Sequence, residues 1–266
     1  MRPLTDLPLD IGPGIKGVLF DIDDTLTTDG KLTAQAYAAM EELQRAGKWV
    51  VPITGRPAGW CDHIARMWPV DAVVGENGAF YFVHDTQGHR LVKRFVASES
   101  ERRANRDKLS AICERILREV PGAAVASDQS YREADLAIDY CEDVPRLADA
   151  DIDRIVAIMK EAGMRSKLSS IHVNGWFGDY DKLGMTRILM RERFGVDLDA
   201  DRGSFVFIGD SPNDAPMFRY FPYSIGVANV QHFLSRLAAP PHYITRSRCG
   251  AGFAEAAHFL LGAGEI

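Results

Sequence analysis

Three short runs of apolar residues along the chain each end in a cluster of acidic or hydroxyl-bearing residues. Runs without polar alternation are typical of strands that are buried on both faces of a parallel sheet. Parallel sheets place ligands beyond the carboxyl ends of their strands, so we expect the three polar clusters to meet in one crevice. The runs and their clusters are 18–20 with 21–25, 50–53 with 54–56, and 205–208 with 209–214.

Helix and strand signals alternate in two separated parts of the chain. In the first part, Thr33 and Gly47 bound a predicted helix that leads into the second apolar run, and residues 72–74 predict another short strand. In the second part, predicted helices at 181–194 and around Met217 flank the third apolar run. This alternation predicts an α/β fold with a doubly wound, mainly parallel, Rossmann-like core sheet.

The pattern changes between these two parts. Ser98, followed by Glu99 and Glu101, predicts the start of a long charged helix that reaches about Val120. Strands and helices that are grouped rather than strictly alternating are typical of an α+β arrangement. The other elements predicted in this region are a hairpin of strands at 79–84 and 90–96, strands at 123–127, 136–140 and 169–173, and a helix at 152–162.

These patterns divide the chain into a core and an insert. We predict a core made of residues 15–83 and 181–266, interrupted by an inserted α+β cap domain of residues 84–180. Residues 1–14 contain three prolines and two glycines, which predicts a loose N-terminal leader rather than a structural element.

Composition narrows the choice of partners. The 266 residues include 31 Lys and Arg against 37 Asp and Glu, a net charge of −6, so no basic excess indicates a nucleic-acid partner. The chain opens without a secretion signal and has no run near the roughly 20 apolar residues of a membrane span, so we expect a cytoplasmic protein without a membrane partner. The four cysteines are spread too widely for a zinc site or a redox pair, which favours reduced thiols.

The first polar cluster has residues suited to phosphoryl transfer. Asp21 and Asp23 are separated by one residue at a strand end, so both carboxylates can face the same side while Ile22 points into the core. An ionised Asp21 can attack phosphorus, and Asp23 can protonate the leaving oxygen and later take a proton from water. Taken alone, the cluster is explained as well by a polar turn over residues 21–25.

Two further residues offer groups that a transferring phosphoryl group needs. The Thr54 hydroxyl and the Lys182 ammonium can hold its oxygens, where the transition state is most anionic. The competing explanation for either residue alone is an ordinary helix cap, a turn or a solvated side chain.

The third cluster supplies the acids of a metal site. A phosphoryl group beside several carboxylates needs a divalent cation, and Mg²⁺ prefers oxygen ligands and takes only one or two carboxylates directly. Asp21 and Asp210 are the expected pair, with Asp214 acting through water or Lys182. A helix N-cap role for Ser211 or Asn213 can coexist with this site.

Together, the clusters 21–25, 54–56 and 209–214, with Lys182, resemble the four motifs of the haloacid dehalogenase-like phosphohydrolases. The position of the insert resembles the large-cap branch, which includes Cof-type, sucrose-phosphate, trehalose-phosphate and mannosyl-3-phosphoglycerate phosphatases. The resemblance implies a nucleophile at Asp21, an acid/base at Asp23, phosphate binding by Thr54 and Lys182, and a Mg²⁺ site at Asp21, Asp210, Asp214 and the backbone carbonyl of Asp23.

Two positions depart from the pattern of this branch. Asp24 stands where many members have glycine, and Lys182 lies in residues 181–184 without the small neighbours that are usual there.

The predicted function is that of a Mg²⁺-dependent phosphatase, which hydrolyses a small phosphorylated metabolite, a sugar phosphate above all, through phospho-Asp21. The alternatives are a phosphomutase of the phosphomannomutase type and a catalytically silent sugar-phosphate sensor. Neither the metabolite nor the oligomeric state is indicated. For Arg132 and His172, a surface ion pair or a satisfied strand position competes with a binding role. The predicted substrate-binding residues are Asp24, Gly55, Arg56, Asn77, Arg132, His172, Asn174 and Asn213.

Overall fold

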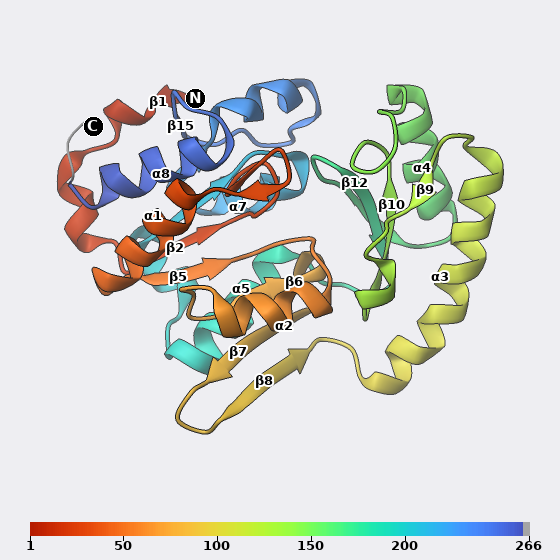
Figure 1. Cartoon of the computed structure of the whole chain (residues 1–266), viewed down its shortest axis with the longest axis horizontal. Coiled ribbons are helices and arrows are strands. Elements are labelled where there is room, and N and C mark those ends of the chain that lie inside the picture. The colour runs from red at the N-terminus through yellow and green to blue at the C-terminus, as the bar shows by residue number, and fades with distance from the viewer. Residues whose placement is uncertain (263–266) are drawn as a thin grey trace.

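A parallel sheet forms the centre of the larger part of the molecule (Figure 1). The structure is a computed structural model that describes residues 1–262, and within them this sheet has six strands. The predicted α/β class with a mainly parallel core sheet is confirmed. The strands, in spatial order, are β1 (Arg2–Pro3), β15 (Tyr243–Ile244), β14 (Tyr223–Gly226), β13 (Phe205–Gly209), β2 (Gly17–Phe20) and β5 (Trp49–Pro52).

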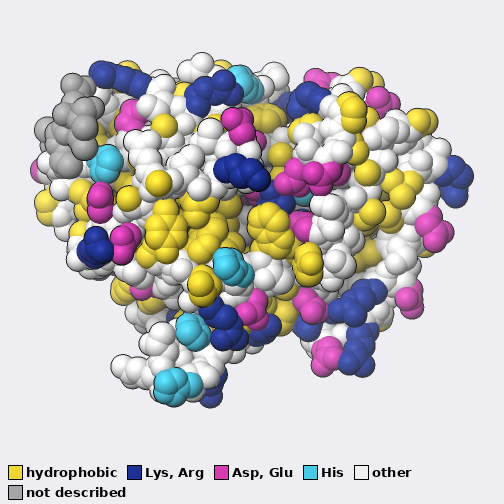
Figure 2. All heavy atoms as spheres, in the orientation of Figure 1, with side chains coloured by type: hydrophobic (Ala, Val, Ile, Leu, Met, Phe, Trp, Pro, Cys, Tyr) yellow, Lys and Arg dark blue, Asp and Glu magenta, His cyan; other side chains and the backbone are white. Residues whose placement is uncertain are grey.

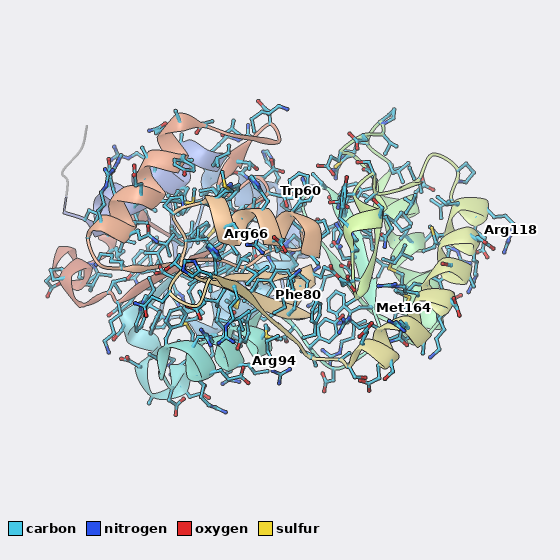
Figure 3. All side chains as sticks on the ribbon, turned by 60° about the horizontal axis from the view of Figure 1, so that its bottom comes forward. Trp60, Arg66, Phe80, Arg94, Arg118 and Met164 are labelled. Carbon is cyan, nitrogen blue, oxygen red and sulfur yellow. The ribbon has the colours of Figure 1, made fainter. Side chains whose placement is uncertain are left out.

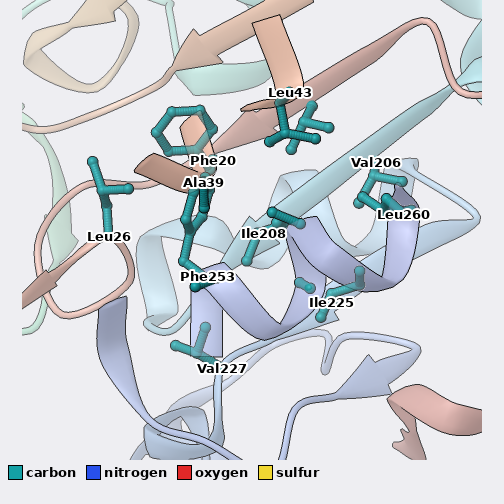
Figure 4. Close-up of a cluster of buried hydrophobic side chains, with 14 of the residues drawn as sticks. Phe20, Leu26, Ala39, Leu43, Val206, Ile208, Ile225, Val227, Phe253 and Leu260 are labelled. Atoms are coloured by element: carbon teal, nitrogen blue, oxygen red, sulfur yellow. The ribbon is translucent and has the colours of Figure 1, made fainter. Parts of the chain in front are cut away.

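Helices cover both faces of this sheet. Successive residues of β2 alternate between two apolar clusters: Phe20 packs in one, with Phe253 at a ring-centroid distance of 4.8 Å, and Leu19 packs in the other. Figure 4 shows the first cluster between the sheet and the helices. Burial on both faces explains why the strands read as unbroken apolar runs. The helices are α1 (Ala34–Arg45) and α8 (Cys249–Leu260) on the first face, and α5 (Lys182–Phe194) and α7 (Ala215–Tyr220) on the second.

A hairpin extends the core beside β5. An isolated parallel bridge joins Ile53 to Val74, and the antiparallel strands that follow pack against α2 (Ala58–Met67). The predicted cap boundary at residue 84 falls inside one of these strands, so we propose that the cap begins after the hairpin, near residue 97. The hairpin sheet consists of β6 (Val73–Gly75), β7 (Phe80–Asp85) and β8 (Arg90–Phe95).

A second, antiparallel sheet lies beside the core and has its own apolar cluster (Figure 1). The strand predicted at 169–173 is wrong in its position: a turn at Ser169 and Ser170 separates two strands there, because the Ser169 hydroxyl accepts from the His172 backbone N–H at 2.9 Å. The elements are β11 (Arg165–Leu168), β12 (His172–Trp176), β10 (Asp135–Asp139) and β9 (Ala124–Val125), covered by α3 (Glu99–Glu119) and α4 (Asp149–Glu161).

The prediction of a loose leader at residues 1–14 is wrong. The segment begins with β1, which pairs with β15, and Leu4 and Leu7 are buried in the core. The Lys48 ammonium also donates to the Gly12 carbonyl at 2.8 Å. Proline and glycine ruled out a long helix or strand, but they did not prevent the leucines from packing.

The remaining strands and α-helix are short. They are β3 (Thr27–Thr28), β4 (Lys31–Leu32) and α6 (Leu198–Asp201). None of the helices within residues 1–262 is long and apolar enough to cross a membrane. Figure 2 shows Lys and Arg side chains interspersed with Asp and Glu over one face of the molecule.

Candidate active site

The site begins where three neighbouring parallel strands end. Phe20 at the end of β2 is in register with Pro52 of β5 and Ile208 of β13. The next residues of these strands therefore emerge at one edge of the sheet. This register brings together the three polar clusters that begin at Asp21, Thr54 and Asp210.

Lys182 lies between two buried carboxylates. Its ammonium is 2.7 Å from Oδ1 of Asp21 and 2.7 Å from Oδ1 of Asp214. The second oxygen of Asp214 accepts from the backbone N–H groups of Asp210 and Ser211, at 3.1 and 3.3 Å. Asp214 thus fixes both the lysine and the loop that presents Asp210.

The charges of this cluster are poorly solvated. Burial raises the pKa of Asp21 to about 8, against the opposing effect of the Lys182 ammonium. Burial, and then the Asp21 and Asp214 carboxylates, raise the pKa of Asp210 well above its usual range. Burial alone would lower the pKa of Lys182, but Asp21 and Asp214 hold it above its ordinary value. The pocket therefore has more negative charge than one ammonium offsets.

This donor set fits a hard divalent cation. One oxygen from each of Asp21, Asp210 and Asp214 lies within 4.8 Å of the other two, and all three side chains are buried. Oxygen-only ligands in an acidic pocket suit Mg²⁺. Both oxygens of Asp214 already accept hydrogen bonds, one from Lys182 and the other from two backbone N–H groups, whereas one oxygen of Asp21 has no such bond from any residue that the structure describes. We therefore propose that Asp21 and Asp210 are the carboxylates that bind the ion directly.

The side chain of Asp23 points away from that cluster. Its two carboxylate oxygens accept from Nε of Arg56, at 2.9 and 3.0 Å. Only its backbone carbonyl therefore stays a candidate metal ligand. The Arg56 guanidinium also lies over the ring of Trp60, 4.3 Å from its centroid, and Figure 3 shows Trp60 on the side of the core that faces the cap.

Four residues predicted to bind phosphate or substrate lie together in the segments that follow β5, β6 and β13. The Thr54 hydroxyl is buried and accepts from the backbone N–H of Arg56 at 3.0 Å. Asn213 donates to the Asn77 side-chain carbonyl at 3.3 Å, and the buried Nδ2 of Asn77 has no protein partner. A Cβ atom on Gly55 would come 3.1 Å from that nitrogen, so glycine keeps the space beside it open.

Asp24 follows Asp23 in the first polar cluster and is partly buried. Burial raises its pKa, and the nearby Ser170 of the cap opposes that shift. The turn that ends β11 therefore reaches the first motif of the core.

The predicted cap residues lie in two different environments. Arg132 is fully buried and donates to Asp128, Asp135 and the carbonyl of Gly55. Asn174 donates to Asp135 at 2.9 Å. These contacts are structural, so we propose that Arg132 and Asn174 support the site rather than bind substrate.

His172 lies closer to the catalytic groups, next to a residue that the sequence analysis missed. Its Nε2 is 2.9 Å from Glu142, which also binds Arg56. Thr25 and Asn229 were missed too: their side chains donate to the two oxygens of Asp210, each at 3.2 Å. Thr25 could have been found from the sequence because it belongs to the first cluster, whereas no short-range sequence pattern indicates a role for Glu142.

Comparisons with known proteins agree with this fold. A family model described as haloacid dehalogenase-like hydrolase matches residues 18–128. A phosphoglycolate phosphatase from Pyrobaculum neutrophilum is 28% identical over 256 residues, which cover 94% of this chain and 98% of the relative.

Solved structures of two phosphatases share the fold. The sucrose-phosphatase of Synechocystis has a TM-score of 0.61 and 18% identity, and the match covers 92% of this chain and 98% of that one. The C-terminal domain of C. albicans trehalose-6-phosphate phosphatase has a TM-score of 0.71 and 14% identity over all of both chains. Over residues 18–128 this chain is therefore similar in sequence to the haloacid dehalogenase-like hydrolases.

Proposed function

We propose that this haloacid dehalogenase-like phosphatase hydrolyses the phosphate ester of a small polyhydroxylated metabolite, with Mg²⁺, through a phospho-Asp21 intermediate. The observation that carries the proposal is the contact of Lys182 with both Asp21 and Asp214, beside Asp210. It supports the proposal because the carboxyl group of the proposed nucleophile lies beside a cation suited to phosphoryl oxygens and within a buried acid set of the kind that holds a metal ion.

Each side chain has a distinct part in the proposed reaction. Asp21 attacks phosphorus as the ester oxygen leaves, and Asp23 protonates that oxygen. Asp23 then takes a proton from the water that hydrolyses the aspartyl phosphate. Thr54 and Lys182 hold the transferring oxygens throughout. Bound Mg²⁺ would supply positive charge against the phosphoryl oxygens and the carboxylates.

The charge of the cap side favours an uncharged leaving group. The Arg56 guanidinium faces Asp23, Asp128 and Glu142, and Arg132 faces two aspartates. Both predicted cations are therefore committed to protein carboxylates. A sugar, which offers hydroxyl groups, suits such a surface better than phosphoglycolate, which carries a second negative charge.

The test is a phosphate-release assay with a panel of hexose phosphates and phosphoglycolate. We expect turnover that requires Mg²⁺ and is abolished by EDTA, and a higher kcat/KM for the hexose phosphates. Asp21→Asn should lose at least about 10³-fold in kcat while keeping its fold, because the amide cannot form the acyl phosphate. Retained turnover in Asp21→Asn would remove the mechanism. Conversion of a hexose 1-phosphate to the 6-phosphate, with little free phosphate, would indicate the mutase instead.

A further inference from the structure

Arg56 connects the catalytic acid/base of the core to the cap. Its guanidinium holds Asp23 at 2.8 Å through Nη2, and the same nitrogen lies 2.5 Å from Oε1 of Glu142. Nη1 reaches a second cap residue, Asp128, at 3.3 Å. Only 5% of the Arg56 side chain is exposed, so its position depends on these carboxylates rather than on water.

A rigid turn presents Glu142 to this arginine. Directly after β10, one oxygen of the buried Asp139 accepts from the backbone N–H groups of Cys141 and Glu142, at 2.9 and 2.8 Å. Its other oxygen accepts from the N–H of Asp143 at 2.8 Å. The turn is therefore anchored to the cap sheet, and Glu142 moves with the cap as a unit.

Glu142 is a carboxylate at neutral pH. Burial tends to raise the pKa of Glu142, but His172 and Arg56 together lower it to about 2. The contact with Arg56 thus joins two full charges at the boundary of core and cap, where only a quarter of the Glu142 side chain is exposed. Such charge-assisted bonds fix geometry more strongly than neutral ones.

We propose that Glu142 is a positioning residue that, when the cap lies against the core, holds Arg56 on Asp23 and thereby couples cap closure to the orientation of the acid/base. The inference rests on the proposed phosphatase function. Glu142 acts through Arg56 and does not need to touch the substrate. Its removal should therefore slow turnover whatever the leaving group is.

The kinetic test compares Glu142→Gln with wild type on p-nitrophenyl phosphate and on a hexose 6-phosphate. We expect kcat to fall roughly 10- to 100-fold on both, with KM changed less than about threefold, since small misplacements of a catalytic group have effects of this size. The matched control is Asp143→Asn, whose exposed side chain contacts Ser127 and not the site. It should keep wild-type kcat.

A double-mutant cycle separates positioning from independent effects. In an Arg56→Ala background, Glu142→Gln should cost almost nothing more, because the residue through which it acts is gone. An equal loss with and without Arg56 would overturn the inference. So would a loss confined to the hexose phosphate, because that result indicates direct contact with the sugar.

Two further measurements distinguish a failure of the proposed phosphatase function from a failure of the positioning role of Glu142. If wild type turns over and Asp21→Asn does not, the proposed function stands, and an unaffected Glu142→Gln refutes the positioning role alone. If wild type is inactive on the panel, closure is measured without turnover. Glu142→Arg sets two guanidinium groups against each other, so its radius of gyration in small-angle scattering should exceed that of wild type. An unchanged radius refutes the coupling of Glu142 to closure.

Discussion

At the scale of single residues, Asp24 shows how a backbone conformation explains a departure from the family pattern. Its φ is +56°, in the left-handed region that glycine adopts most readily. The Thr27 hydroxyl accepts from its N–H at 3.1 Å, and Asn229 donates to its carbonyl at 2.9 Å. These bonds hold the turn that aims Asp21 and Asp23, which explains why a glycine suits this position.

Substitutions at Asp24 test this strain. Asp24→Gly removes the Cβ penalty and a partly buried charge near Asp23, so the free energy of unfolding should rise by up to about 1 kcal/mol, with kcat kept within about threefold. Asp24→Ala keeps the Cβ atom and loses the local polar contacts of the side chain, so it should lower that free energy by about 1 kcal/mol. Urea unfolding measures the stability of both variants. An alanine variant as stable as the glycine variant would show that the positive φ at position 24 does not cost stability.

The strand-end residues could be predicted from sequence because the register of a parallel sheet fixes where they emerge. Asp21, Thr54 and Asp210 needed only the apolar runs before them. Arg132 could not be placed this way, since one of its partners is the carbonyl of Gly55, 77 residues away. Glu142 was missed for the same reason: its partner Arg56 lies 86 residues away in sequence.

At the scale of elements, the start of α5 places the lysine of the site. Asp181 is the N-cap, and its side chain accepts from the N–H of Gly184 at 2.7 Å. Gly78, in the turn after β6, packs directly against this helix start with φ of +105°. A Cβ atom there would lie 2.1 Å from the carbonyl oxygen of Asp181 and 2.9 Å from the backbone nitrogen of Lys182.

Gly78→Ala should therefore damage both stability and activity. We expect the free energy of unfolding to fall by about 2–4 kcal/mol, from the positive φ and the clash, and kcat to fall more than tenfold as Lys182 shifts. Gly47→Ala is the matched control, because Gly47 has φ of +75° but open space around its missing Cβ. It should lose only about 1–2 kcal/mol and keep kcat. Equal effects of the two substitutions on kcat would contradict this account of Lys182.

Element prediction succeeded where local signals agreed with burial. Ser98 begins α3 with the expected cap, and its hydroxyl and the Glu101 side chain bond each other's backbone N–H groups. It failed at 169–173, where apolar Ile171 lies in a turn between two strands, and at the N-terminus, where packing of Leu4 and Leu7 outweighs the breakers around them. In both places tertiary contacts, which short patterns do not contain, decide the structure.

At the scale of the whole molecule, core and cap each have an apolar cluster of their own. They meet through a shared cluster, in which Trp176 of the cap packs with Ala58 and Phe80, and through polar groups. Glu76, fully buried after β6, is central to this junction. One of its oxygens accepts from the N–H groups of Ala58 at 3.0 Å and Glu133 at 2.9 Å. The other accepts from Ala134 at 2.6 Å and Asp135 at 3.2 Å. A single core carboxylate thus serves four backbone donors, three of them from the cap side.

Glu76→Gln keeps the shape of this side chain but replaces one acceptor oxygen with an NH₂ donor. That donor would face the N–H groups of Ala134 and Asp135, so two buried donors lose their acceptor and the free energy of unfolding should fall by about 2–4 kcal/mol. Glu133→Gln is the control. The Glu133 side chain forms ion pairs with Arg102 and Arg106 that are partly exposed to solvent, so this substitution should lower the free energy of unfolding by less than about 1 kcal/mol. Urea midpoints measure the cost, and amide hydrogen exchange at residues 133–135 should accelerate in Glu76→Gln alone. Equal urea midpoints for the two variants would contradict this role of Glu76. They would show that other contacts join core and cap, because Glu76→Gln removes the acceptor of two buried N–H groups at the junction.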